Sequence, residues 1–241
     1  MKKLIFQYYA GSKTLPKWAN ESTKRFKHYA KLHGADYWFT PESTFSPESY
    51  YFEHLKLIYD EKFSKYDRIL YVDVDVIVER FDDNIFECDI DDIGMVPEYR
   101  APGMNAPPVF TLDSHYITYR DLAKRFDLPV VQPRTVESKY LMFNSGTILW
   151  SRNGLDKARH KFMDWKKWYH QVPGQFGLDQ PFINGQVTKH LDYTELPLKW
   201  NCFPAFRFDT GHEPKDAVFV HYTGGKKKFI EQIYGSFNIE D

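Results

Sequence analysis

The chain has 241 residues and a nearly balanced charge, with 32 Lys and Arg against 33 Asp and Glu. That balance excludes the sequence-wide basic footprint of a nucleic-acid-binding protein, and no run approaches the ~20 apolar residues that a membrane span needs. The N-terminal apolar stretch breaks at Gln7, too soon for a signal peptide. Cys88 and Cys202 show neither a disulfide nor a zinc pattern, so we expect a reduced, cytoplasmic location.

The first part of the chain alternates apolar strands with amphipathic helices. Pro16 lies near the first turn of the first expected helix, and Gly34 follows that helix as a C-cap. Strand–helix–strand order with nearly unbroken apolar strands predicts an α/β fold, with a Rossmann-like, mostly parallel central sheet and helices on both faces. Ligands bind at the carboxyl ends of such strands, so residues 1–98 are interpreted as the nucleotide-binding half of a single domain, 1–241. The expected strands are 4–10, 36–39, 68–78 and 93–97, and the expected helices are 17–33 and 51–63.

Residues 99–139 are different, because they are rich in proline and interrupt the alternating pattern. A helix is expected at residues 114–126. The segment is interpreted either as a lid or acceptor-binding insertion or as a plain surface excursion. Regular structure then returns, with expected helices at 155–169 and about 179–187 and expected strands at 140–150 and 217–222.

The most informative segment is the apolar run 69–78, which contains Asp73 and Asp75. Side chains two residues apart share one face of an extended strand, so both carboxylates can point to one place. Two buried like charges each lose hydration that a partner must replace. A divalent cation compensates them better than Arg68 or Arg80, and hard oxygen ligands suit Mg²⁺ or Mn²⁺. A pair of partly solvated turn aspartates is the alternative interpretation.

A second pattern lies near the C-terminus, where an apolar strand leads to His221, Gly224, Gly225 and Lys227. An imidazole is a suitable metal ligand, the glycines allow close backbone approach to a ligand, and a lysine supplies a point charge for phosphate. A metal-bound diphosphate requires these groups together. A solvated basic tail is the alternative, but with the acidic pair His221 completes an expected three-residue metal site.

At this point the sequence resembles glycosyltransferase family 8, the retaining GT-A enzymes that include glycogenin and bacterial galactosyl- and glucosyltransferases. Two departures concern the first strand, which ends in Tyr8-Tyr9 without the family's usual acidic residue, and Pro181, which stands where a second acid is common. The family's motifs occur here in their usual order, as Lys56 in place of an arginine, Asp73-Val74-Asp75, Asn144-Ser145-Gly146, Asp179-Gln180, and His221, Gly224 and Lys227.

The resemblance implies a GT-A fold and a metal-dependent transfer of a sugar from a UDP-sugar donor to a hydroxyl of a glycan or other acceptor, with retention of configuration. Residues 99–241 then form the donor-sugar and acceptor half and the C-terminal metal and phosphate segment. The implied ion is Mn²⁺ or Mg²⁺, held by Asp73, Asp75 and His221. The residues implied at the nucleotide and diphosphate are Tyr8, Lys56, Asp73, Val74, Gly224 and Lys227, and those implied at the transferred sugar are Asn144, Asp179 and Gln180.

Two other functions stay open at the level of sequence. A GT-A protein that has lost turnover would bind a sugar nucleotide or glycan without transferring it, although such a module would not need three metal ligands. A sugar-1-phosphate nucleotidyltransferase also holds a metal with acids on strands. It normally has a glycine-rich basic loop after the first strand, and Gly11-Ser12-Lys13 is a poor version of one.

Overall fold

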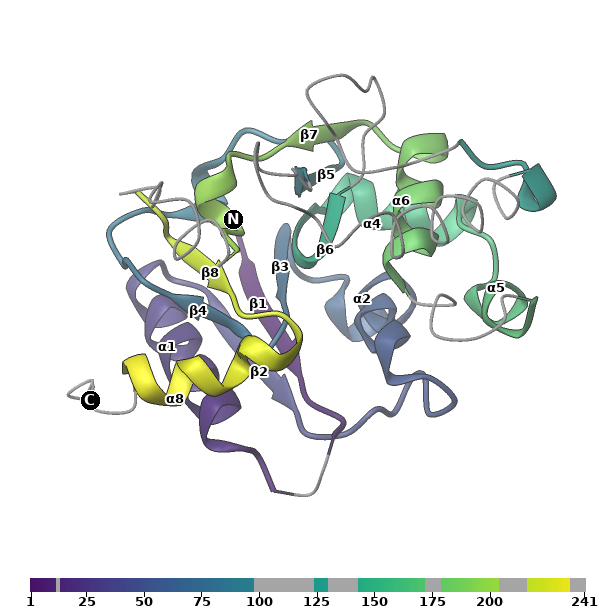
Figure 1. Cartoon of the computed structure of the whole chain (residues 1–241). Coiled ribbons are helices and arrows are strands. Elements are labelled where there is room, and N and C mark those ends of the chain that lie inside the picture. The colour runs from purple at the N-terminus through teal and green to yellow at the C-terminus, as the bar shows by residue number, and fades with distance from the viewer. Residues whose placement is uncertain (12–13, 98–123, 130–142, 172–178, 204–215, 235–241) are drawn as a thin grey trace, which may run out of the picture.

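The computed structural model describes residues 1–11, 14–97, 124–129, 143–171, 179–203 and 216–234. Its centre is a six-stranded sheet with the strand order β2-β1-β3-β6-β5-β7 (Figure 1). Neighbouring strands are parallel except where β6 pairs with β3 and β5, so β6 alone runs opposite to the other five. The predicted mostly parallel sheet is confirmed. Its strands are β1 (Lys3–Tyr8), β2 (Asp36–Thr40), β3 (Arg68–Val72), β5 (Ile93–Pro97), β6 (Phe143–Ser151) and β7 (Tyr193–Glu195).

A second, two-stranded sheet pairs β4 (Val76–Val78) antiparallel with β8 (Phe219–His221). The α-helices are α1 (Lys17–Leu32), α2 (Lys56–Tyr59), α4 (Arg152–Lys161), α5 (Trp165–Gln171), α6 (Asp179–His190) and α8 (Lys228–Tyr234). The 3-10 turns are η1 (Tyr50–Leu55), η2 (Glu61–Phe63), η3 (Ile85–Glu87), η5 (Leu198–Trp200) and η6 (Gly224–Lys227). Among the helices in the described ranges, none combines the length and the hydrophobicity that crossing a bilayer requires.

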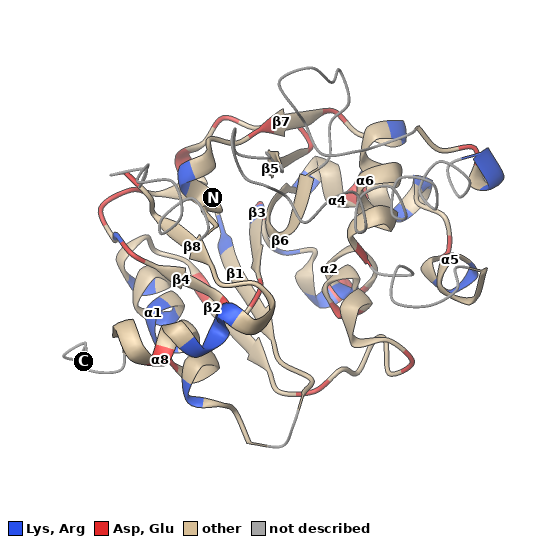
Figure 2. Cartoon of the chain, in the orientation of Figure 1, with Lys and Arg blue, Asp and Glu red and all other residues tan. Residues whose placement is uncertain are grey.

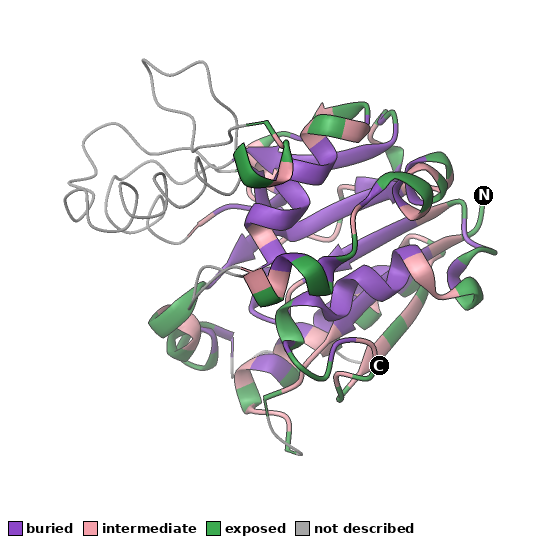
Figure 3. Ribbon diagram, turned by 90° about the vertical axis from the view of Figure 1, so that its right-hand side faces the viewer, coloured by how far each residue is buried: buried purple, intermediate pink, exposed green. Residues whose placement is uncertain are grey.

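Successive residues of the central strands point to opposite faces of the sheet, and each face has its own core. Phe6 and Tyr71 pack with residues of η1, α4, α5 and α6. Ile5 and Leu70 pack instead with α1, β4 and β8. The expected cover on both faces is therefore present, and the central strands are mostly buried (Figure 3). Charged residues occupy mainly the helices and connecting segments, while the strands are mostly uncharged (Figure 2).

Helix α1 confirms the expected helix at 17–33 and its expected C-cap. Gly34 has φ +63°, the left-handed conformation that glycine adopts most easily. The N–H of Ala35 donates to the carbonyl of Ala30 at 2.9 Å, and that of Gly34 to Lys31 at 3.4 Å. These two bonds form a Schellman motif, which satisfies carbonyls that the helix end leaves open.

Three expected elements are broken in the structure. The expected strand 68–78 is two strands in two different sheets, because Val76 N–H donates to the carbonyl of Asp73 and turns the chain between them. The expected helix 51–63 is a 3-10 turn, a single α-turn and a second 3-10 turn, since Asp60 is extended and caps Lys62 N–H. The expected helix 155–169 is divided into α4 and α5 by Phe162, which has extended dihedrals and is buried.

The remaining predicted elements lie in the second half of the chain. Helix α6 runs three residues beyond the predicted 179–187, and β8 is shorter than the predicted 217–222. Strand β7 and helix α8 were not predicted. Of the expected strand 140–150, residues 140–142 lie outside the described residues, and so do residues 99–123 and 130–139 of the 99–139 segment. Of the helix expected at 114–126, residues 124–126 are helical.

Candidate functional site

Asp73 and Asp75 lie in the turn where the chain leaves β3 for β4, and not within a continuous strand as predicted. The second sheet then brings the C-terminal segment to this turn. Val76 is the register partner of His221, and Tyr222 N–H donates to the carbonyl of Asp75 at 2.8 Å. The strand that carries His221 is therefore attached by backbone hydrogen bonds to the acidic turn. This pairing joins two motifs that are almost 150 residues apart.

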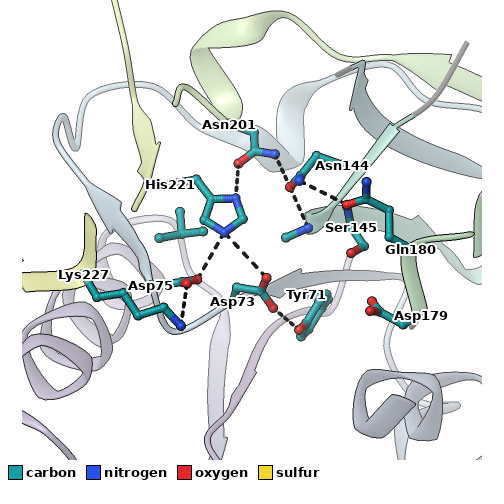
Figure 4. A network of polar contacts seen from close by, with 12 residues as sticks. Tyr71, Asp73, Asp75, Asn144, Ser145, Asp179, Gln180, Asn201, His221 and Lys227 are labelled. Carbon is teal, nitrogen blue, oxygen red and sulfur yellow. Dashed lines mark hydrogen bonds and ion pairs between the residues drawn. The ribbon is translucent and has the colours of Figure 1, made fainter. Parts of the chain in front are cut away.

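The three side chains converge on one place (Figure 4). His221 Nε2 lies 3.1 Å from Asp75 Oδ1 and 3.7 Å from Asp73 Oδ2. One ligand atom from each of the three residues lies within 4.8 Å of the others. Two carboxylate oxygens and an imidazole nitrogen at this spacing form a donor set suited to Mn²⁺ or Mg²⁺. The residues present therefore fit a divalent cation, and they are the three that the sequence predicted.

The charges at this turn are unevenly compensated. Burial acts to raise the pKa of Asp75, but His221 and Lys227 outweigh it and hold that pKa at about 2. Lys227 Nζ lies 2.9 Å from Asp75 Oδ2. Burial, and then the charge of Asp75, raise the pKa of Asp73 to about 6. For His221, burial acts to lower the pKa, but the two carboxylates raise it above the ordinary value. The turn thus carries a negative charge on Asp73 that a cation would neutralise.

A network of side-chain amides connects this turn to the start of α6. Asn144 Nδ2 and Ser145 N–H both donate to Gln180 Oε1, at 3.2 and 3.3 Å. Asn144 Oδ1 accepts from Gly146 N–H at 2.9 Å and from Asn201 Nδ2 at 2.8 Å. The first residues of β6, which the sequence singled out as an N-S-G stretch, therefore hold the predicted Gln180 in the same network as His221 (Figure 4).

Asp179 opens α6 and faces a residue that the sequence analysis missed. Asp179 Oδ2 lies 3.1 Å from Nε2 of His54, which is buried in η1. The His54 ring stacks on the ring of Tyr71, with centroids 4.7 Å apart. Tyr71 in turn donates its hydroxyl hydrogen bond to Asp73 Oδ1. One stack of rings therefore joins the carboxylate predicted at the sugar to the carboxylate predicted at the metal.

Some signals for these missed residues were present in the sequence. Tyr71 precedes Asp73 by two positions in the strand predicted at 68–78, a spacing that would put both side chains on one face. For Asn201, no spacing rule indicated the contact with His221. His54 carried no signal, because only the tertiary fold brings η1 against α6.

Of two residues predicted to contact the nucleotide, Tyr8 lies close to the acidic turn and Lys56 has its polar partners elsewhere. The Tyr8 ring stacks on Tyr71 at 5.9 Å, and its hydroxyl donates to the Tyr51 carbonyl at 3.4 Å. Lys56 is buried in an ion pair with Glu53 and donates to Thr44 Oγ1 at 2.9 Å. Tyr8 therefore lies beside the site, whereas the ion pair and hydrogen bond of Lys56 go to Glu53 and Thr44 and not to the acidic turn.

Val74 and Gly224 lie on the two segments that meet at the metal site. Val74 is buried between the two aspartates. Gly224 is exposed and has φ +60°, in the turn that leads from β8 to Lys227. A left-handed conformation at this position favours glycine, which explains the residue type in the motif.

Comparisons with known proteins give a matching family model and solved structures of similar fold. The family model described as Glycosyl transferase family 8 matches residues 12–229. A search of the curated proteins finds no match. Among solved structures, the chain is similar to a glycosyltransferase involved in the glycosylation of the major capsid of PBCV-1, with 15% identity and a TM-score of 0.58 over 96% of this chain and 98% of that one.

Two further solved structures have a similar fold. One is the galactosyltransferase LgtC in complex with donor and acceptor sugar analogues, with 13% identity and a TM-score of 0.54 over 98% of this chain and 96% of that one. The other is the apo form of mouse xyloside xylosyltransferase 1, with 13% identity and a TM-score of 0.53 over 92% and 97%. At these identities the likeness shows a shared fold.

Proposed function

The chain belongs to glycosyl transferase family 8, and we propose that it is a metal-dependent hexosyltransferase that moves a sugar from UDP to an acceptor hydroxyl with retention of configuration. It is a glycosyltransferase with a GT-A fold. The UDP donor and the retention are what the family resemblance implies, and the proposed metal dependence is carried by one observation. The acidic turn, His221 and Lys227 meet at the point where the two sheets join.

The position of each group around the acidic turn suggests its proposed role at the diphosphate. Loss of a nucleoside diphosphate leaves negative charge on the departing phosphate, and a bound Mn²⁺ or Mg²⁺ would neutralise it as a Lewis acid. Asp73, Asp75 and His221 would hold that ion. Lys227 Nζ, already 2.9 Å from Asp75, would add fixed positive charge beside it. Tyr8 offers an aromatic face for the nucleobase at the end of β1.

The sugar side of the proposal rests on the amide network. Gln180 and Asn144 are fixed by hydrogen bonds to each other and to the backbone of β6, so they can present polar groups to sugar hydroxyls without reorganising. Asp179 is oriented by His54 and would contact the transferred sugar or the charge that develops on it. For retention we propose attack on the same face as departure, and an inverted linkage in the product, seen by NMR, would contradict it.

The first test measures UDP released from a panel of UDP-sugars, with and without Mn²⁺ and without an added acceptor. We expect release from one donor, dependent on Mn²⁺ and lost in Asp75→Asn. The matched control is Asp82→Asn, which removes an exposed carboxylate that pairs with Arg80. That variant should retain the wild-type rate.

The other outcomes separate the remaining functions. Mn²⁺-dependent binding of UDP without release from any donor would replace the proposed transferase with a binding protein. Production of pyrophosphate from a nucleoside triphosphate and a sugar phosphate would identify a nucleotidyltransferase instead. No binding of UDP under any condition would exclude UDP as the nucleotide.

A further inference from the structure

A buried amide, Asn201, contacts the imidazole of His221 on the side opposite to the acidic turn. Asn201 has no exposed surface, and its Oδ1 lies 3.1 Å from His221 Nδ1. Its Nδ2 donates to Asn144 Oδ1 at 2.8 Å. The other ring nitrogen, Nε2, faces Asp75 and Asp73. The two nitrogens of His221 therefore face different partners, one an amide and the other the candidate metal site.

Backbone groups determine which way each amide in this network points. Gly146 N–H can only donate, so the Asn144 atom that it contacts is the oxygen. The same oxygen contacts Asn201, which must therefore present its NH₂ group there. Asn201 is left with its oxygen toward His221 Nδ1. Since that oxygen can only accept, Nδ1 carries the hydrogen.

Ser145 N–H supplies a second, independent reference point. It donates to Gln180 Oε1, so this atom is also an oxygen, and the Asn144 group that faces it is the NH₂ group. Asn144 thus presents its NH₂ to Gln180 and its oxygen to Asn201, in agreement with the assignment from Gly146. Two backbone N–H groups of β6 therefore give the same orientation for the whole chain of amides.

We propose that Asn201 is the positioning residue that holds His221 as its Nδ1–H tautomer, with the Nε2 lone pair directed at a divalent cation. This inference rests on the proposed metal-dependent function and adds a residue that acts through His221 without touching the ion. A metal-binding histidine commonly donates its other N–H to an oxygen, which fixes the ring and raises its basicity. In this chain the oxygen belongs to an amide that is itself fixed by β6.

The test compares Mn²⁺ affinity, followed by the EPR signal of free Mn²⁺, in the wild type and three variants. Asn201→Leu keeps the approximate size and removes both hydrogen bonds, and we expect about 10- to 100-fold weaker binding. Asn201→Asp keeps an oxygen that accepts from Nδ1–H, but it places a second oxygen against Asn144 Oδ1 where the NH₂ group donated, so we expect an affinity between those of the wild type and Asn201→Leu. Thermal unfolding of each variant shows that it is folded.

Asn184→Leu is the matched control. Asn184 is also a fully buried amide, but its side chain bonds to the backbone of Phe143 and to the Gln180 carbonyl and not to His221. The Asn184→Leu variant should be less stable than the wild type, but its folded form should bind Mn²⁺ with wild-type affinity. If Asn201→Asp binds as weakly as Asn201→Leu, or if Asn201→Leu binds like the wild type, the positioning role is wrong and the metal site stands. If the wild type does not bind Mn²⁺, the metal site fails and this inference fails with it.

Discussion

Gly146 lies so close to the imidazole of His221 that a β-carbon on it would stand 2.2 Å from His221 Cε1. The same β-carbon would stand 2.9 Å from Asp73 Oδ2. Carbon contacts below 3.0 Å are essentially never seen in real side chains. The glycine in the N-S-G stretch is therefore required by the packing of the metal site, since any side chain there would displace a candidate ligand.

Gly146→Ala is expected to weaken Mn²⁺ binding by at least about 10-fold, the effect typical of a disturbed ligand shell, because the His221 ring must move. The forced contact should also destabilise the fold by about 1–3 kcal/mol. Isothermal titration with Mn²⁺ and thermal unfolding measure the two effects. As a control, Gly225→Ala adds a β-carbon with no neighbour within 4 Å, and it should change neither quantity. Wild-type Mn²⁺ affinity in Gly146→Ala would show that His221 is not a ligand.

Tyr71→Phe should weaken Mn²⁺ binding about 10-fold. The hydroxyl of Tyr71 donates to Asp73 Oδ1 and leaves Oδ2 on the side of His221. Without it the carboxylate is free to rotate, while the ring stack on His54 is kept. Tyr29→Phe removes a hydroxyl that bonds the backbone of Asp83 and Ile85, and it should lower stability only. Equal Mn²⁺ affinity for wild type and Tyr71→Phe would remove Tyr71 from the site.

His54→Phe should reduce kcat for UDP release by about 100-fold, the lower end of the range for lost acid–base groups. The aromatic ring can still stack on Tyr71, but Asp179 Oδ2 loses the partner at 3.1 Å. Mn²⁺ affinity should not change, because His54 contacts none of the three candidate ligands. Steady-state kinetics and Mn²⁺ titration measure the two quantities. A proportional loss of kcat and Mn²⁺ affinity would indicate general misfolding.

Asp73→Asn is expected to stabilise the metal-free protein. Burial and the charge of Asp75 raise the pKa of Asp73 to about 6, so folding disfavours the ionised form at neutral pH. Removing that charge should raise Tm by about 2–4 °C, which corresponds to ~1 kcal/mol in a chain of this size. The thermal shift that Mn²⁺ gives the wild type should disappear. A lower Tm in the variant would mean that the fold itself compensates the charge of Asp73.

Glu53→Gln should destabilise the protein by about 3 kcal/mol at neutral pH, because it leaves Lys56 buried without its charge partner. Burial acts to raise the pKa of Glu53, but Lys56 and the N–H of Ser46 outweigh it, so the pKa is lowered. The stability that ionised Glu53 contributes is therefore fully present above the pKa of about 4.3 that a glutamate has in the unfolded chain. It is lost as the pH falls through the lower pKa that Glu53 has in the folded protein.

The measurement is Tm against pH for the wild type and Glu53→Gln, and the gap between the two curves should narrow in acid. Glu48→Gln, which removes a partly exposed ion pair with Lys166, should have little effect at any pH. A gap that stays constant with pH would show that packing, and not charge, accounts for the loss.

The sequence by itself predicted the covered, mostly parallel sheet and the three residues of the candidate metal site. Unbroken apolar strands must be buried on both faces, which predicts a covered, mostly parallel sheet without further information. Asp73, Asp75 and His221 lie beside apolar runs, where burying a charged group is costly unless a partner compensates it. The structure brings all three together. Their spacing in sequence carried no information on how they would meet.

Only the tertiary structure decided the remaining part of the site. The expected single strand 68–78 turns after Val72, because pairing β4 with β8 satisfies its backbone in a second sheet. That turn, and not a shared strand face, brings the two carboxylates to His221. The contacts of His54 with Asp179 and of Asn201 with His221 join segments 125 and 20 residues apart. Such contacts follow from how whole elements pack, and local propensity and periodicity do not encode them.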